Sequence, residues 1–229
     1  MRTNMTRIIL LLAAISAAMA QPSQGPNLYS IEKEIELGKR LASETQKSLQ
    51  AQPDARLQAI GDKLAAKTDG TFQYRFFVYS TVSTPSEPIA LPGGAVFVAQ
   101  STLPADDADT AAMLAHAVAH IALRHYTREL TRREQMNSPP QSLPPNDTGT
   151  GQGIRQSMEM FFARRFTPQS EFEADQLAVK LLIDAGYDPE ALVRWLQSLP
   201  VPKANLAFGD RPVPSGRVAA VLRAIKAAQ

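Results

Sequence analysis

Apolar residues recur at helical spacing along most of the chain, which predicts a mainly helical protein. The spacing predicts helices at residues 29–49, 54–70, about 106–130, 155–166, 168–186, 188–198 and 215–228. Aromatic and β-branched runs predict two strands at 72–80 and 91–100, and a Pro-Gly-Gly turn leads into the second. The pattern therefore favours an α+β fold that is mainly helical and has a small β-sheet.

The first twenty residues have the pattern of a signal peptide. A basic start precedes an apolar run at residues 8–18, and a small-x-small cleavage pattern ends just before Gln21. The run is shorter than the ~20 residues of a comfortable membrane span, and an uncleaved anchor is the alternative. We therefore expect export to the periplasm or the medium, with no membrane span once residues 1–20 are removed.

The composition is that of a chain with one core. With 229 residues, 44% of them hydrophobic, residues 21–229 are expected to form one domain, two small domains being the alternative. The net charge of +2 comes from Arg2 and Arg7, so the rest is balanced and nucleic acid is not an expected partner. Cysteine is absent, which excludes disulfides and thiolate metal sites. Residues 136–153 are rich in Pro, Gly, Ser and Asn and predict a flexible loop.

All the histidines of the chain lie in one predicted helix, at positions 116, 120 and 125. His116 and His120 stand four residues apart and project from the same face, the geometry by which a two-histidine helix binds zinc. Ordinary hydrogen-bonded histidines are the alternative. However, apolar residues surround the pair on all sides, which predicts a buried helix whose imidazoles need partners. His125 falls on the opposite face and is expected to be a capping or surface residue.

Acidic residues near the start of the helix predicted at 168–186 are candidates for a third ligand. Acids in a first helical turn also complement the helix dipole, and alone that explanation would suffice. Glu171 and Asp175, however, share a face at i and i+4, so one carboxylate can bind a metal while the other holds a ligand imidazole. Glu173 is expected to point away into solvent.

Three motifs follow one another at suitable separations: Ala-Leu-Pro-Gly-Gly-Ala-Val-Phe-Val at 90–98, the histidine segment at 113–125, and Ser-Glu-Phe-Glu-Ala-Asp with Gly-Tyr-Asp-Pro within 170–189. Together they make the chain, from about residue 29 onward, resemble metallopeptidase family forty-eight. These are the HtpX-like, CAAX-prenyl-protease-like and BepA/LoiP-like gluzincins.

The resemblance implies a zincin-like domain with its small β-sheet beside the active-site helix. It implies one Zn²⁺ ion held by His116, His120 and Glu171, with Asp175 supporting a ligand. It also implies a strand that borders the cleft and pairs with an extended or unfolded polypeptide. That strand is formed by Gly94, Ala95, Val96 and Phe97.

The chain departs from the family pattern at three positions. Where the family carries the glutamate that takes a proton from the attacking water, this chain has Ala117. Arg211 replaces a histidine, while Pro212 and Arg217 match the pattern. Glu87 replaces an asparagine in the upstream substrate strand that the resemblance implies at residues 87–94. A positioned base is worth ~10²–10⁴-fold in rate, so hydrolysis is expected to be impaired.

Three functions stay open. The chain is an exported zinc metallopeptidase of the protein quality control type with very slow turnover, a zinc-retaining pseudopeptidase that binds peptides or a partner as an adaptor or holdase, or a metal-free interaction domain. The retained ligand residues favour the first two, because buried ligands without a metal are costly. Nothing in the sequence predicts the oligomeric state.

Overall fold

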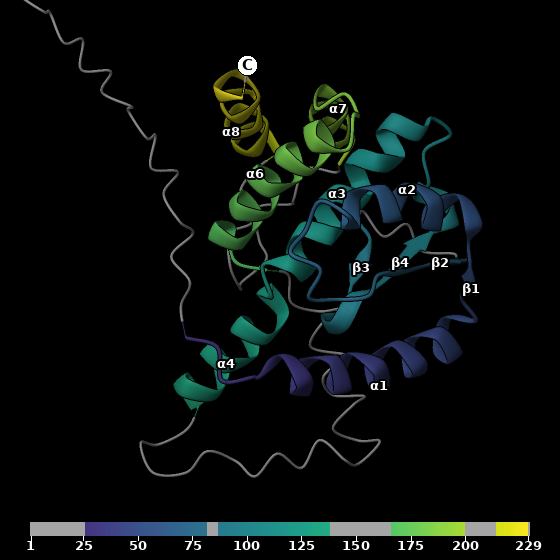
Figure 1. The fold of residues 1–229 in the computed structure, drawn as a ribbon, viewed down its shortest axis with the longest axis vertical. Helices are drawn as coiled ribbons and strands as arrows, with labels where there is room; N and C mark the ends of the chain where they lie inside the picture. The colour runs from purple at the N-terminus through teal and green to yellow at the C-terminus, as the bar shows by residue number, and fades with distance from the viewer. Residues whose placement is uncertain (1–25, 82–86, 138–165, 200–213, 229) are drawn as a thin grey trace, which may run out of the picture.

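The computed structural model describes residues 26–81, 87–137, 166–199 and 214–228, which are mainly helical with one small sheet (Figure 1). The predicted α+β class is confirmed. The segment at 1–20 and almost all of the helix expected at 155–166 and of the loop expected at 136–153 lie outside the described residues. Within the described ranges, no helix combines the length and the apolar character needed to cross a membrane.

The sheet has four strands in the order β1-β2-β4-β3. β2 (Arg75–Tyr79) and β4 (Ala95–Ala99) lie within the two predicted strands and pair in parallel. β1 (Gln52–Pro53) and β3 (Ile89–Ala90) are two-residue strands that the hydrophobic pattern did not predict, although β3 lies within the upstream strand that the family resemblance implies. Each pairs antiparallel with its neighbour, and β3 lies on the outer side of β4. β4 is therefore an inner strand, and among the described residues β3 and β1 form the two edges of the sheet.

Both faces of the sheet are covered, which explains why every residue of β4 is buried and apolar. On one face, Val96 and Val98 belong to the core shared with α2 (Ala55–Ala65) and α3 (Asp107–Ala122). Alternate residues of an extended strand point to opposite faces, so Ala95, Phe97 and Ala99 pack into a second core on the other face.

The second core lies between the sheet and α1 (Ile31–Leu49), which runs on the other side of the strands from α2 and α3 (Figure 1). Phe97 of β4 stacks on Phe77 of β2 there, with ring centres 4.8 Å apart. α1 begins after Ser30, whose side-chain oxygen accepts a hydrogen bond from the Lys33 N–H.

α3 is the central helix of the fold. It packs on α2, on α6 (Pro168–Asp184) and on α7 (Glu190–Ser198), and α8 (Pro214–Ala227) packs on α6 and α7. Asp106 caps its start, and all residues from 110 to 121 are buried. The prediction of a buried helix from apolar residues on all sides is therefore confirmed.

The helix predicted to run to about residue 130 is instead broken after Ala122. Arg124 has a left-handed backbone with φ 57°, and α4 (His125–Asn137) starts directly after it. The Arg124 guanidinium donates to the buried Glu34 carboxylate at 2.6 Å and to the Tyr29 carbonyl at 2.5 Å. These contacts come from the start of α1, so the spacing of residues within the helix itself could not predict the break.

Gly38 allows α1 to approach the turn at Pro92–Gly94 that leads into β4. A Cβ atom at residue 38 would lie 1.9 Å from the Pro92 carbonyl oxygen, which is far inside van der Waals contact. Gly93 within the turn has φ 76°, a conformation that favours glycine. The glycines therefore fix how closely α1 covers the sheet.

Gly38→Ala is expected to lower the free energy of unfolding by at least about 1–3 kcal/mol, because the added methyl group overlaps backbone atoms that cannot move aside easily. Urea denaturation followed by circular dichroism measures the change. Lys39→Ala, on the exposed face of the same helix, is the control and should stay within about 0.5 kcal/mol. Equal stability of the two variants would show that α1 does not pack this closely on the turn.

Candidate metal centre

The three residues expected to bind a metal converge on one point. Nε2 of His116 lies 3.0 Å from Nε2 of His120 and 3.5 Å from Oε2 of Glu171. Oε1 of Glu171 lies 4.0 Å from Nε2 of His120. In a tetrahedral zinc site with Zn–N bonds of roughly 2.0–2.1 Å, the ligand atoms are about 3.3 Å apart. Two imidazoles and one carboxylate at these separations fit a zinc ion.

Two packed helices supply these ligands. α3 carries both histidines one turn apart, and α6 carries Glu171 in its first turn, just after the Thr167 cap. Because α3 and α6 pack against each other, Glu171 at the start of α6 comes to lie beside the two histidines in the C-terminal half of α3. All three side chains are at most 4% exposed.

Arg217 of α8 joins the acidic groups around the centre. Its guanidinium lies 2.7 Å from Asp175, 3.1 Å from Glu171 and 3.4 Å from Glu87. In their ionised forms these carboxylates outnumber the one guanidinium by two, and neutral imidazoles add no charge. A divalent cation would balance the group, so the charges as well as the donor atoms suit Zn²⁺.

Asp175 supports the first histidine. Its Oδ1 lies 3.0 Å from Nδ1 of His116, which leaves Nε2 of that ring directed at the other two ligands. Burial opposes charging of His116, but the hydrogen bonds to Asp175 and Glu171 outweigh it and raise the pKa of the imidazole. Without metal, a protonated His116 can donate to both Asp175 and His120, so a proton and a metal ion compete for the same position.

Asp175 is in turn held by Arg217 through two parallel hydrogen bonds. Nε donates to Oδ2 and Nη2 donates to Oδ1, each at 2.7 Å. Burial acts to raise the pKa of the Asp175 carboxyl, but Arg217 and His116 more than offset it, and the pKa is lowered. Burial likewise disfavours the charge of Arg217, yet Asp175 and Glu171 raise its pKa above the usual value. Both groups therefore stay charged although they are buried.

His125 and Glu173 contradict the sequence-based expectation. His125 is buried, with Nδ1 2.9 Å from Nδ1 of His120 and Nε2 3.2 Å from Oε2 of Glu173. The expectation of a surface position assumed one continuous helix, whereas the break at Arg124 turns His125 back toward the centre. Glu173, expected in solvent, is only 8% exposed because it pairs with His125. Burial lowers the pKa of His125 to about 4 although Glu173 opposes the shift, so its imidazole is neutral near pH 7.

Two aromatic side chains enclose the imidazoles. Phe166 lies nearly flat on His120, with ring centres 4.0 Å apart and an angle of 17° between the planes. Trp195 of α7 lies 5.1 Å from His116 by the same measure. No sequence pattern pointed to either residue, because both contacts arise only from the way the segments pack.

Position 117 lies beside the first ligand but carries no reactive group. Ala117 is 2% exposed and belongs to the main hydrophobic core. Its methyl group cannot accept a proton. Arg211 and Pro212 lie outside the described residues, so of that family motif only Arg217 is placed here.

The strand expected to pair with a substrate is an inner strand of the sheet. β4 pairs with β2 along its whole length, and Val96 and Phe97 also pair with β3, so both sides of these residues are already occupied. Gly94 belongs to the turn, and Ala95 only begins the strand. Within the described residues, the edge on this side is β3. It follows Glu87, whose carboxylate reaches Arg217, so this edge and not residues 94–97 is the candidate for strand pairing.

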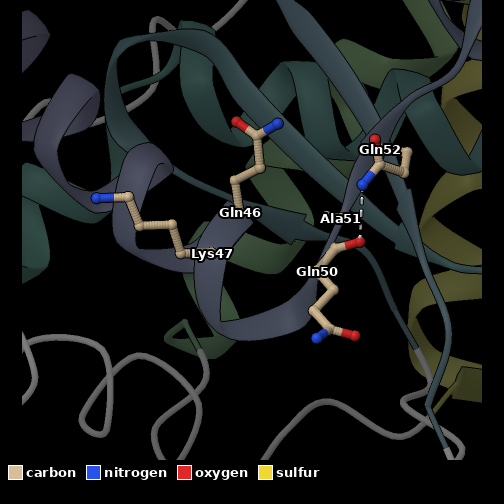
Figure 2. Close-up of a pocket in the computed structure, with 5 residues that line it drawn as sticks. All are labelled: Gln46, Lys47, Gln50, Ala51 and Gln52. Atoms are coloured by element: carbon tan, nitrogen blue, oxygen red, sulfur yellow. Dashed lines mark hydrogen bonds between the residues drawn. The ribbon is translucent and has the colours of Figure 1, made fainter.

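A pocket of about 600 Å³ lies elsewhere, at the end of α1 (Figure 2). Its lining consists of Gln46, Lys47, Gln50, Ala51 and Gln52, with one hydrogen bond of 3.3 Å from the Gln52 amide to the Gln50 carbonyl. None of these residues belongs to the metal centre, so the two features are separate.

Comparison with known proteins gives one family and a set of longer relatives. The model of peptidase family M48 matches residues 51–225. The chain is 30% identical over 110 residues to the beta-barrel assembly-enhancing protease of Escherichia coli O157:H7, a match that covers 41% of this chain and 21% of that protein. It is 24% identical over 160 residues to the Yersinia pestis protein of the same name, covering 62% of this chain and 32% of the relative. The matched part is thus a third of these relatives or less.

Arg217→Met is expected to lower the free energy of unfolding of the metal-free protein by roughly 3–5 kcal/mol, because it leaves Asp175 and Glu171 buried without their cation. Arg223→Met is the matched control, since Arg223 is exposed on the same helix, and should change stability by less than about 0.5 kcal/mol. Denaturant titration of both variants measures the difference.

The effect of Arg217 should also depend on pH. Because the pKa of Asp175 is lowered in the folded protein, its contribution to stability is present above the ordinary range of an aspartate, about pH 4, and is lost as the pH falls through the lowered value. The stability gap between the wild type and Arg217→Met should therefore narrow in acid. A gap that is independent of pH would contradict the role given to the Asp175–Arg217 pair.

Proposed function

The chain belongs to peptidase family M48, and we propose that it is an exported zinc metallopeptidase that binds extended polypeptides and hydrolyses them very slowly. The observation that carries the proposal is the contrast within α3. His116 and His120 meet Glu171 and have their supporting contacts, whereas Ala117 between them has no carboxylate.

The residues of the chain can do most of what the chemistry requires. Zinc, when bound, supplies a Lewis acid for a substrate carbonyl. Asp175 and Arg217 orient His116, and Trp195 and Phe166 pack against the imidazole rings of His116 and His120. The missing part is a group that takes a proton from water and returns it to the leaving amine. Its absence lowers the rate by at least ~10²-fold.

Polypeptide binding is proposed at the edge strand β3. Among the described residues β3 is an edge of the sheet, and Glu87 just before it contacts Arg217 of the centre. Backbone hydrogen bonds from such an edge to an extended peptide do not depend on the peptide sequence. Unfolded or extended segments are therefore the ligands that this edge suits. The relatives named beta-barrel assembly-enhancing protease support a role in the quality control of exported proteins, with residues 1–20 as the export signal.

A zinc-retaining adaptor or holdase without turnover is the second candidate. It is favoured by the same Ala117, because binding needs the edge and the metal centre but not the base. A metal-free interaction domain is the least supported, because two buried imidazoles and the Glu171 carboxylate converge on one point, and polar groups are costly to bury there unless they bind something.

The purified chain is expected to hold about one zinc ion per molecule, because two imidazoles and a carboxylate meet at distances suited to zinc. Elemental analysis after gel filtration measures the content. His120→Ala should lose the ion, whereas Glu44→Gln, which changes an exposed carboxylate of α1, should keep it. A wild-type chain without zinc, with a stability that His120→Ala leaves unchanged, would refute the zinc site.

Ala117→Glu is expected to raise cleavage of an unfolded model protein by at least ~10²-fold, the low end for a positioned base. Residue 117 is one position after a ligand, about 100° around the helix, so a glutamate there can reach the attacking water beside the centre without displacing a histidine. Ala117→Gln has nearly the same size but no basic group, and it should stay inactive.

Arg211 stands where the family has a histidine, so Ala117→Glu with Arg211→His is the second test. If this double variant folds, binds zinc and cleaves nothing, the impaired-peptidase reading is wrong and the adaptor reading is supported. Gel assays over a time course distinguish these outcomes.

A further inference from the structure

The second zinc-binding candidate, His120, meets a support of a different kind from the Asp175 carboxylate beside His116. Nδ1 of His120 faces Nδ1 of His125 at 2.9 Å, and Nε2 of His125 faces Oε2 of Glu173 at 3.2 Å. His125 is 2% exposed and Glu173 is 8% exposed. These groups form a buried line that leads away from the proposed metal position.

The direction of each hydrogen bond in this line follows from the metal. A neutral His120 that binds a metal through Nε2 carries its proton on Nδ1, so it donates to Nδ1 of His125. His125 then carries its own proton on Nε2 and donates it to Glu173, which accepts. Each hydrogen bond in the line therefore has one donor and one acceptor, with both imidazoles neutral and Glu173 ionised.

The far end of the line is also fixed. Oε1 of Glu173 accepts a hydrogen bond of 2.8 Å from the Gln169 amide, one turn earlier on α6. In the middle of the line, the left-handed backbone of Arg124 sets the direction in which α4 starts, and so places the ring of His125. The carboxylate and the ring are thus held from two different helices.

We propose that His125 and Glu173 are positioning residues for the metal ligand His120. They fix its tautomer and its ring plane, as Asp175 does for His116. The inference rests on the zinc site proposed above and adds residues that lie outside the ligand set. Partners of this kind typically change metal affinity by ~10–100-fold when they are removed.

The test measures zinc affinity, not activity, by competition with a coloured chelator. His125→Phe keeps a flat ring but removes both nitrogens, and Glu173→Leu removes the acceptor. Each is expected to raise the zinc Kd by ~10–100-fold. Glu173→Gln keeps an acceptor oxygen, and Gln169 can rotate its own amide to suit it, so this variant should stay close to the wild type. Glu190→Ala, exposed on α7, is the control for a carboxylate outside the line.

Nitrogen NMR of histidine-labelled, zinc-loaded protein gives a readout that general packing would not alter. We expect a proton on Nδ1 of His120 and on Nε2 of His125. In His125→Phe the chemical shift of the His120 Nδ1 signal should change to that of a nitrogen without a hydrogen-bond partner. Urea denaturation of the metal-free variants shows whether they are folded. If His125→Phe is not folded, the comparison of Glu173→Leu with Glu173→Gln still tests the proposal.

The outcomes separate the two claims. A wild-type chain that binds no zinc overturns the zinc site and this inference with it. A wild-type chain that binds zinc, with His125→Phe and Glu173→Leu unchanged in Kd, overturns only the inference. The opposite tautomer of His125 overturns it as well.

Discussion

The metal centre depends on a buried ion pair that the metal itself does not make. Arg217 of α8 donates two hydrogen bonds to Asp175 of α6, and Asp175 contacts Nδ1 of His116 on α3. The same guanidinium reaches Glu171 and the residue before the edge strand, Glu87. One side chain thus connects the last helix, both ligand helices and the sheet edge, and the position of each is defined relative to the others. Since a buried guanidinium is stable only among acids, Arg217 and the carboxylates around it stabilise one another.

The parts of this centre that could be predicted from the sequence are those that lie within one regular element. His116 and His120 share a face because a helix has 3.6 residues per turn, and that holds wherever the helix is placed. Glu171 and Asp175 follow the same rule on the second helix. The apolar surroundings of the histidines correctly indicated burial, and two of the four strands were visible as aromatic and β-branched runs.

The parts that could not be predicted depend on a change of direction or on pairing between distant segments. His125 enters the centre only because Arg124 breaks the helix, and that break is held by Glu34 on another element. Glu173 was expected in solvent because His125, with which it pairs, was expected on the opposite face of one continuous helix. β3 is too short to produce an alternating pattern, yet it pairs with β4 and makes β4 an inner strand. Arg124 and His125 can be read in the sequence, but nothing near them shows that the helix breaks there, because the contact that holds the break comes from Glu34.

The helix break at Arg124 also bears on how the protein reaches its native state. The bond from Arg124 to Glu34 joins residues 90 positions apart, and the contact of Arg217 with Glu87 spans 130 positions. Contacts of such high sequence separation require large loops to close and form slowly. The isolated α3 and α6 segments therefore cannot preassemble a complete site, and the ion is expected to be captured by an already folded chain. In kinetic terms, we expect a metal ion to bind late in maturation, after the nucleus of folding has formed.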